Sequence, residues 1–386
     1  MQKIKLLKSL LIPTLGISVI GSIAAVSTSC ESKKKNVKIT ANEDSTLELK
    51  NEGGNSPILQ YSTDEKNWQN YEESIIIPKG TSYYFKGWNL NGWSQSDIAY
   101  STLFITGNVS ISGNIIGLLD NGKGSLPQVS SNYCFYNLFQ GSTGITSVSE
   151  DFLLIKNLLG QGCYAGMFQG CTSLTTAPDL PATSLPQFCY GSMFQGCTSL
   201  TKAPDLPATY LTMSCYYEMF QGCTSLTTAP NLSAIKLAGY CYFSMFDDCS
   251  SLTIVPDLPA TTLADYCYSY MFNGCTSLTT TPNLPATSLA TGCYYGMFTG
   301  CTSLTTAPDL PATTLEENCY RGMFADCTKL GSIKINYIGN VQDAPKNAFS
   351  LWVNNVATTG VFYYKGNDTL VNFEFPSNWT INRDWN

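Results

Sequence analysis

The amino-acid sequence predicts an α/β solenoid, a right-handed stack of coils built from 26-residue units, preceded by a small all-β, sandwich-like domain. The first observation is the phrase Cys-Tyr-x-x-Met-Phe-x-x-Cys-Thr/Ser-x-Leu, which recurs seven times at intervals of 26 residues. A constant period of this kind is typical of stacked units that share one continuous core. The second is a run of short alternating segments before the repeats. The third is an apolar amino-terminal stretch that ends just before Cys30.

The first 29 residues predict an export signal, a lipoprotein signal peptide at 1–29. Three lysines precede an apolar stretch at 10–26, and small residues follow it up to Cys30. This ending resembles a bacterial lipobox, although Ser27 stands where leucine is usual. The resemblance implies that Cys30 receives a diacylglycerol and begins a lipidated tether at 30–36. An uncleaved membrane anchor is the alternative, since about 18 apolar residues can span a bilayer.

The segment 37–124 predicts the β-sandwich-like domain. Short segments rich in β-branched and aromatic residues alternate there with glycine-containing turns. Aromatic side chains are frequent in this part of the chain and are open to two interpretations. They could be stacking platforms for sugars, or they could pack in the core and along edge strands. The residues concerned are Trp68, Tyr71, Tyr83, Tyr84, Phe85, Trp88 and Trp93.

Each 26-residue unit predicts one short helix followed by one short strand. Cys189, Met193 and Cys197 are spaced as the buried stripe of a helix, and Gly196 is placed to end it. Leu200 then opens a strand that pairs with the same segment of the next coil, and the prolines that follow keep this strand brief. A helix and a strand in a unit of this length match the pattern of leucine-rich repeats.

A family resemblance rests on the phrase Met193-Phe194-x-Gly196-Cys197-Thr198-Ser199-Leu200-Thr201. It resembles the Ala-Phe-x-x-Cys-x-Ser-Leu-Thr core of BspA-like leucine-rich repeats, which occur in bacterial and protist surface proteins, including those of the mycoplasma type. The likeness covers roughly residues 133–332. This unit is longer than the commonest one in the family, and cysteine stands where isoleucine is usual. The resemblance implies adhesion or contact with a host surface.

The pattern predicts boundaries for the rest of the chain. A degenerate phrase at 134–139 predicts an amino-terminal cap at 125–162, because a terminal coil would otherwise expose its apolar column. The solenoid itself is expected at 163–332. A segment rich in aromatic residues predicts a carboxyl-terminal cap at 333–386.

Composition disfavours several classes of function. Only 13% of residues are charged and the net charge is −7, which is unsuited to binding nucleic acid. The chain has no histidine, the commonest general base and a frequent zinc ligand. No paired carboxylates suggest a hydrolase. We therefore expect no enzyme activity, no catalytic residues, no cofactor and no metal site.

The repeats contain two ladders of seven cysteines each. Neighbouring coils are close enough for disulfides between them, but an odd number in each ladder cannot pair completely. The sequence favours free, buried thiols that fill space between coils. With Cys30 lipidated, fifteen of the sixteen cysteines are expected to be free.

One strand position varies between repeats while its neighbour stays threonine, so it is the candidate binding face. Strand side chains alternate in direction, which predicts that only one of the two columns is exposed. A solvated strand face without a ligand is the alternative. An Asp/Asn column three residues further on could bind calcium, but such residues after proline more often cap turns. The candidate face is Thr176, Lys202, Thr228, Ile254, Thr280 and Thr306.

These observations predict a protein held by lipid on the outer face of the cell membrane, in the extracellular space. Its repeat solenoid is expected to mediate adhesion to, or interaction with, a host or matrix protein or glycan. A structural or antigenic spacer with no partner is the main alternative. A glycan-binding or glycan-processing protein is a further one.

Overall fold

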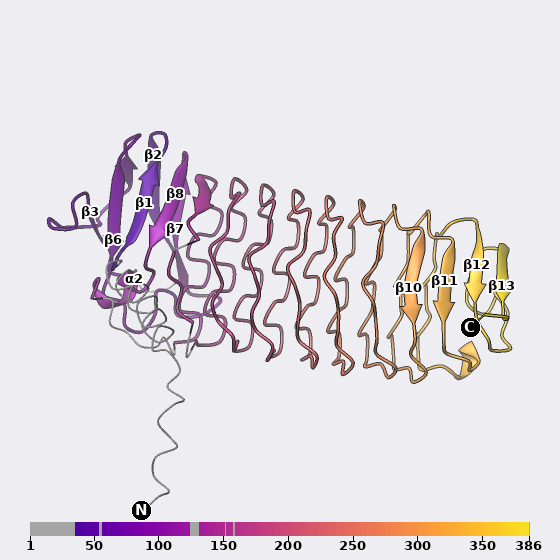
Figure 1. Cartoon of the computed structure of the whole chain (residues 1–386). Coiled ribbons are helices and arrows are strands. Elements are labelled where there is room, and N and C mark those ends of the chain that lie inside the picture. The colour runs from indigo at the N-terminus through magenta and orange to yellow at the C-terminus, as the bar shows by residue number, and fades with distance from the viewer. Residues whose placement is uncertain (1–34, 54–55, 124–130, 151, 157–158, 386) are drawn as a thin grey trace, which may run out of the picture.

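The protein is a long rod of stacked coils with a β domain at its amino-terminal end (Figure 1). The computed structural model describes residues 35–53, 56–123, 131–150, 152–156 and 159–385. The signal peptide, Cys30 and most of the tether lie outside these residues and stay predictions. Within the described ranges, no helix is both long and apolar enough to cross a membrane.

The β domain consists of two sheets with a shared core. One has the strand order β4-β3-β6-β1-β8-β9 and the other β5-β2-β7. Inward-facing side chains such as Ile39, Leu47, Phe85 and Leu103 are fully buried, as expected for alternating strands. The bounds are β1 Val37–Ala41, β2 Ser45–Glu52, β3 Gln60–Ser62, β4 Gln69–Asn70, β5 Ile75–Ile77, β6 Ser82–Lys86, β7 Tyr100–Thr106 and β8 Val109–Gly113.

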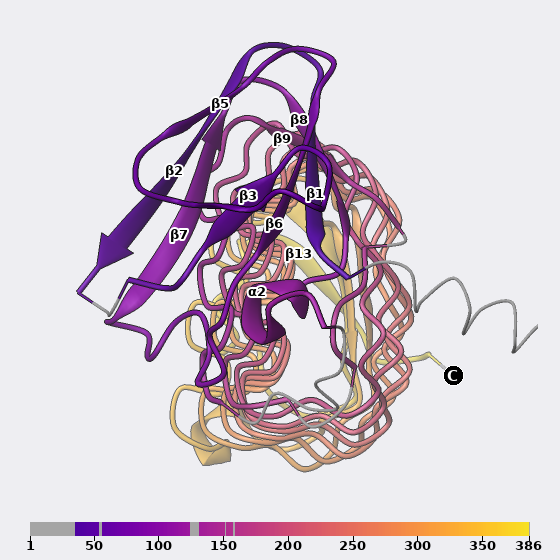
Figure 2. The ribbon, with the colours of Figure 1, turned by 90° about the vertical axis from the view of Figure 1, so that its left-hand side faces the viewer.

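The β domain and the solenoid share one hydrogen-bonded framework. Strand β9 (Ile145–Val148) runs parallel to β8, and its Ser147 forms a parallel bridge with Thr176 of the first full repeat. The short helix α2 (Gly117–Asp120) lies in the connection between β8 and the coils, and it is labelled in Figure 2, which looks along the rod from its amino-terminal end. The rings of Phe135 and Phe139 stack on the next coil, so the degenerate phrase is itself a coil.

The predicted helix in each repeat is wrong, because the segment is a chain of successive turns. Backbone N–H groups alternate between two partners: Tyr190 donates to Cys215 of the next coil, at 3.0 Å, whereas Met193 donates to Tyr190, at 3.3 Å. In a helix every donor would bond four residues back. Left-handed backbone recurs every fourth residue, with φ of 57° at Phe188, 52° at Ser192 and 71° at Gly196.

Identical side chains stack in columns to form the solenoid core. The methionine, leucine and both cysteine columns are fully buried in every repeat. The phenylalanine rings stack with centroids 5.4 to 5.8 Å apart. The tyrosines that follow the first cysteine stack at 5.8 to 6.1 Å. Each aromatic pair contributes about 0.5–1.5 kcal/mol beyond the burial of its area.

The coils continue past residue 332, into the segment predicted as a cap. The sheet β10-β11-β12-β13 is parallel throughout, and Phe324 N–H donates to Trp352 across coils, at 2.8 Å. Buried Trp352 takes the place of a repeat phenylalanine at this end. The bounds are β10 Thr306–Leu310, β11 Ser332–Ile335, η1 Val341–Asp343, β12 Thr359–Tyr363 and β13 Asn378–Asn382.

Candidate functional site

The candidate binding face is aligned along the rod. Isolated parallel bridges join Lys202 to Thr228 and Thr228 to Ile254 in successive coils. All six residues of the face are exposed, but so is the constant threonine column beside them. The prediction that only one column is exposed is therefore wrong. In this part of the repeat the coils meet mostly at single bridges, so the segment lacks the regular pleat that makes side chains alternate.

The constant threonine column has a structural role. Thr175 Oγ1 donates to the carbonyl of Thr146 at 2.8 Å, and Thr253 Oγ1 donates to the carbonyl of Thr227 at 3.3 Å. These bonds satisfy backbone acceptors of the preceding coil. The variable column is threonine in four repeats, lysine in one and isoleucine in one.

The cysteines of the solenoid are core residues. All fifteen in the described part of the chain are free and buried. Thiols of the second ladder donate to phenylalanine carbonyls, as Cys197 Sγ does to Phe168 O at 3.1 Å. Burial raises the pKa of Cys171 and of Cys223 to about 12, so the thiols stay protonated and unreactive at neutral pH. Among the described residues, no group of His, Cys, Asp or Glu could hold a metal ion.

A surface that the sequence reasoning missed lies on the turn segments. Seven half-buried aromatic side chains form a continuous strip across five central repeats. Tyr217 stacks on Phe243 with centroids 5.1 Å apart, and Tyr240 stacks on Tyr266 at the same distance. The aromatic strip consists of Phe188, Tyr217, Tyr240, Phe243, Tyr266, Tyr270 and Tyr295, and each of its rings touches another.

Four residues of the aromatic strip occupy left-handed backbone. Their φ angles are 57° at Phe188, 56° at Tyr240, 54° at Tyr266 and 55° at Tyr270. A left-handed conformation costs a residue other than glycine about 1–2 kcal/mol. At the corresponding positions of other coils the chain has glycine at Gly162, Gly166, Gly292, Gly296 and Gly322, and other left-handed residues at Tyr133, Asn137, Ser192, Ser214, Glu218, Ser244 and Asn318.

Carboxylates and amides flank the aromatic strip. Gln195 Nε2 donates to Glu218 at 3.1 Å, and Gln221 and Asn273 both donate to Asp247, at 2.9 and 2.6 Å. Burial raises the pKa of both Glu218 and Asp247. Burial, with a smaller contribution from the Glu218 carboxylate, raises the pKa of Tyr217 to about 12.

The one cation in contact with the aromatic strip lies at its carboxyl-terminal end, among the residues that the structure describes. The guanidinium of Arg321 lies 5.5 Å from the centre of the Tyr295 ring. Carboxylates therefore dominate the charge along the rest of the aromatic strip. A surface of tyrosine, phenylalanine and arginine has the composition of the central part of protein interfaces.

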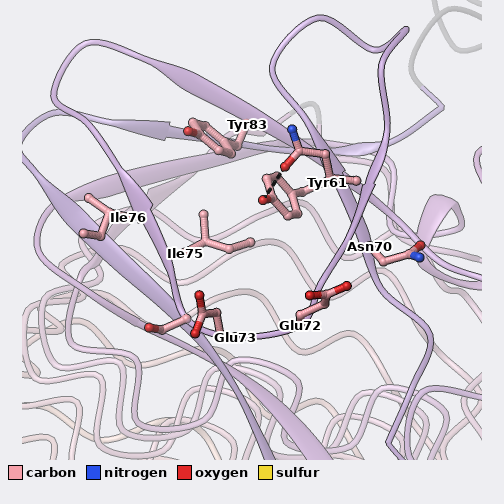
Figure 3. Close-up of a pocket in the computed structure, with 9 residues that line it drawn as sticks. Tyr61, Asn70, Glu72, Glu73, Ile75, Ile76 and Tyr83 are labelled. Carbon is pink, nitrogen blue, oxygen red and sulfur yellow. Dashed lines mark hydrogen bonds between the residues drawn. The ribbon is translucent and has the colours of Figure 1, made fainter.

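The β domain contains a separate cleft between the ends of its two sheets (Figure 3). Its volume is about 410 Å³. Tyr61 and Tyr83 form one wall, with near-parallel rings whose centroids are 5.9 Å apart, and Ile75 of the other sheet lies opposite. The remaining lining residues are Gln69, Asn70, Glu72, Glu73, Ser74 and Ile76.

The stacked coils and their columns of identical core side chains define the class of protein. It is a leucine-rich-repeat solenoid whose surface is suited to contacts with other molecules. A family model described as a BspA type leucine rich repeat region of six copies matches residues 163–270 and 245–356. These matches together cover half of the chain, which belongs to this family. No curated protein and no solved structure matches it. Such repeats have the capacity for protein–protein interaction and are typically not catalytic.

Proposed function

We propose that the protein is a lipid-anchored cell-surface protein whose aromatic strip binds a host or matrix protein. The observation that carries this proposal is the continuous contact of seven half-buried aromatic rings across five repeats. Aromatic side chains gathered on a surface that the core does not use are typical of interaction sites. Most other coils carry glycine, serine, glutamate or asparagine at the positions of Phe188, Tyr240, Tyr266 and Tyr270, so the fold itself does not require aromatic residues there.

The charge near the aromatic strip supports a partner with a basic surface. Glu218 lies beside Tyr217, and Asp247 lies near Tyr270. Burial, with smaller contributions from Tyr266 and Asp265, raises the pKa of Tyr240. Opposite charge on the partner would speed the encounter and exclude acidic proteins. Aromatic side chains of this size bury large areas in an interface and often supply most of its binding energy.

Replacing the strained tyrosines by glycine tests this proposal. The triple variant Tyr240→Gly, Tyr266→Gly and Tyr270→Gly copies the residues of the outer repeats, so we expect it to fold. Surface plasmon resonance against purified matrix and host-surface proteins should show saturable, salt-sensitive binding by the unchanged chain, reduced at least tenfold in the variant. Tyr210→Ala, which removes a tyrosine that is 81% exposed elsewhere on the solenoid, is the control.

A second variant distinguishes the two candidate faces. The column Lys202→Ala, Thr228→Ala and Ile254→Ala removes the face expected from the sequence and leaves the aromatic strip unchanged. Loss of binding in this variant alone would move the site to that column. No saturable binding to any protein would leave the chain as a surface spacer.

Two further parts of the proposal concern the anchor and the location. The lipobox-like ending before Cys30 supports a diacylglycerol anchor on the outer face of the membrane. Protease treatment of intact cells should remove the solenoid from the cell surface, whereas a protected chain would contradict this location.

A further inference from the structure

The β domain has a cleft that the interaction surface of the solenoid does not use. It opens where the two sheets end, between the short strands β4 and β5, and the β4–β5 connection runs along its rim (Figure 3). This connection is fixed in place, because the hydroxyl of Tyr71 accepts a hydrogen bond from Leu49 N–H of β2 at 2.8 Å. The fold of the domain therefore holds the rim of the cleft in a defined position.

The walls of the cleft combine aromatic and aliphatic surface. The rings of Tyr61 and Tyr83 are inclined by 19° to each other and are only half-buried. Their strands pair in register with Tyr61 opposite Phe85, so both tyrosines continue the inner face of the sheet beyond the filled core. Tyrosine rings side by side offer a flat apolar surface with a hydroxyl at its edge. The C–H face of a pyranose ring is complementary to such a surface.

The polar groups of the cleft provide both donors and acceptors. Gln69 Oε1 accepts a hydrogen bond from the Tyr61 hydroxyl at 2.6 Å, and Asn70 Oδ1 accepts one from Gln60 Nε2 at 2.8 Å. With its oxygen used in this way, the Gln69 amide can offer N–H donors to a ligand. Asn70 pairs with Gln60 on the other face of the sheet, and its amide points away from the two rings (Figure 3). The side chains of Glu72 and Glu73 are exposed at the rim, where their carboxylates can accept hydrogen bonds from the hydroxyl groups of a ligand.

The charge and shape of the cleft limit the class of ligand. None of the nine lining residues is cationic and two are glutamates, so an acidic ligand would be repelled. The edge strands β4 and β5 have two and three residues, too short to pair with an added peptide strand. A single lysine or arginine side chain would fill only part of the volume and would bring further donors against the amide N–H groups.

We propose that this cleft binds a short neutral oligosaccharide, stacked on Tyr61 and Tyr83 and hydrogen-bonded by Gln69, Glu72 and Glu73. The cleft would give the protein a carbohydrate-binding activity in addition to the protein contacts proposed for the solenoid. The two activities use residues in different parts of the chain, so they can be tested separately.

The test is saturation-transfer NMR and isothermal titration calorimetry on the chain from residue 31 to residue 386. Neutral probes are maltotriose, cellotriose and triacetylchitotriose, with sialyllactose and a heparin fragment as acidic probes and trilysine as a basic one. We expect a neutral trisaccharide to bind with a Kd of about 0.1–1 mM, the weak range expected of an open cleft. The acidic probes should bind at least tenfold more weakly.

Variants then place the binding in the cleft. Tyr83→Ala should weaken neutral-sugar binding at least tenfold, whereas Tyr210→Ala on the solenoid should not change it. Gln69→Ala, which changes an exposed side chain of the cleft, tests the same site even if Tyr83→Ala unfolds the domain, and Asn70→Ala on the other face of the same strand is its matched control. The proposal is overturned if no neutral probe binds, if trilysine or an acidic probe binds more tightly, or if binding survives the cleft variants.

Discussion

Raising the pH above about 9 should unravel the solenoid, because its buried thiols can ionise only in unfolded coils. Burial raises the pKa of Cys267 from its ordinary 9.0 to about 12, and it raises the pKa of Cys171 and of Cys223 to about the same value. Below pH 9 the thiols are protonated in both the folded and the unfolded chain, so the free energy of unfolding keeps its full value. Between pH 9 and 12 the unfolded chain loses protons that the folded chain keeps, so the free energy of unfolding falls.

The size of the effect follows from these pKa values. At about pH 10, ionisation stabilises each unfolded thiol by roughly 1.4 kcal/mol relative to neutral pH. Each repeat buries two such thiols, so a coil loses roughly 3 kcal/mol. Over seven repeats the loss is roughly 20 kcal/mol, more than the ~5–15 kcal/mol that holds a typical domain together. Coils contact only their neighbours, so unravelling can begin at an end and spread.

The assay is circular dichroism and the ultraviolet absorbance of the thiolate, followed together from neutral pH to about pH 11. Both signals should change in one step that begins near pH 9. The same titration in about 1 M NaCl, where the Debye length is about 3 Å, screens repulsion between surface charges but leaves buried thiols unaffected. Thiolate absorbance that appears while the circular dichroism is unchanged would refute the burial of the ladders. A transition abolished by salt would assign the unfolding to surface charge.

Three further predictions concern the thiols, the core and the anchor. A thiol reagent should find no reactive thiols in the folded chain from residue 31 onward and fifteen in denaturant, and fewer would reveal disulfides. Phe220→Ala opens a cavity between rings that lie 5.7 Å away on either side, and it should cost about 3–5 kcal/mol in chemical denaturation. Thr228→Ala on the exposed column should stay within about 0.5 kcal/mol of the unchanged chain. Cys30→Ser should abolish incorporation of radiolabelled fatty acid, and retained label would contradict lipidation.

The stacked core could be predicted from the sequence because every coil repeats the same buried residues. The mistaken helix arose from the spacing of Cys189, Met193 and Cys197, four residues apart. A helix and a chain of four-residue turns both place such residues on one side, so spacing alone does not separate them. Comparing repeats does separate them, because glycine recurs every fourth residue at Gly162, Gly166 and Gly170. A helix interior disfavours glycine, whereas left-handed turns favour it.

The aromatic strip could not be found by searching for familiar chemistry, because it contains no metal-ligand spacing and no catalytic pair. Its signal is a set of aromatic residues at positions where most other coils carry small or polar residues. The ring of Tyr266 lies over Gly292 of the next coil, where a Cβ atom would come within 2.4 Å of it, so the two positions are complementary. The ring of Tyr270 lies over Gly296 in the same way. Tyr240, by contrast, is followed in the next coil by Tyr266, and the two rings stack with centroids 5.1 Å apart. The left-handed run of rings ends where the chain changes from aromatic residues to Gly292 and Gly296, so its extent is a property of this sequence rather than of the repeat.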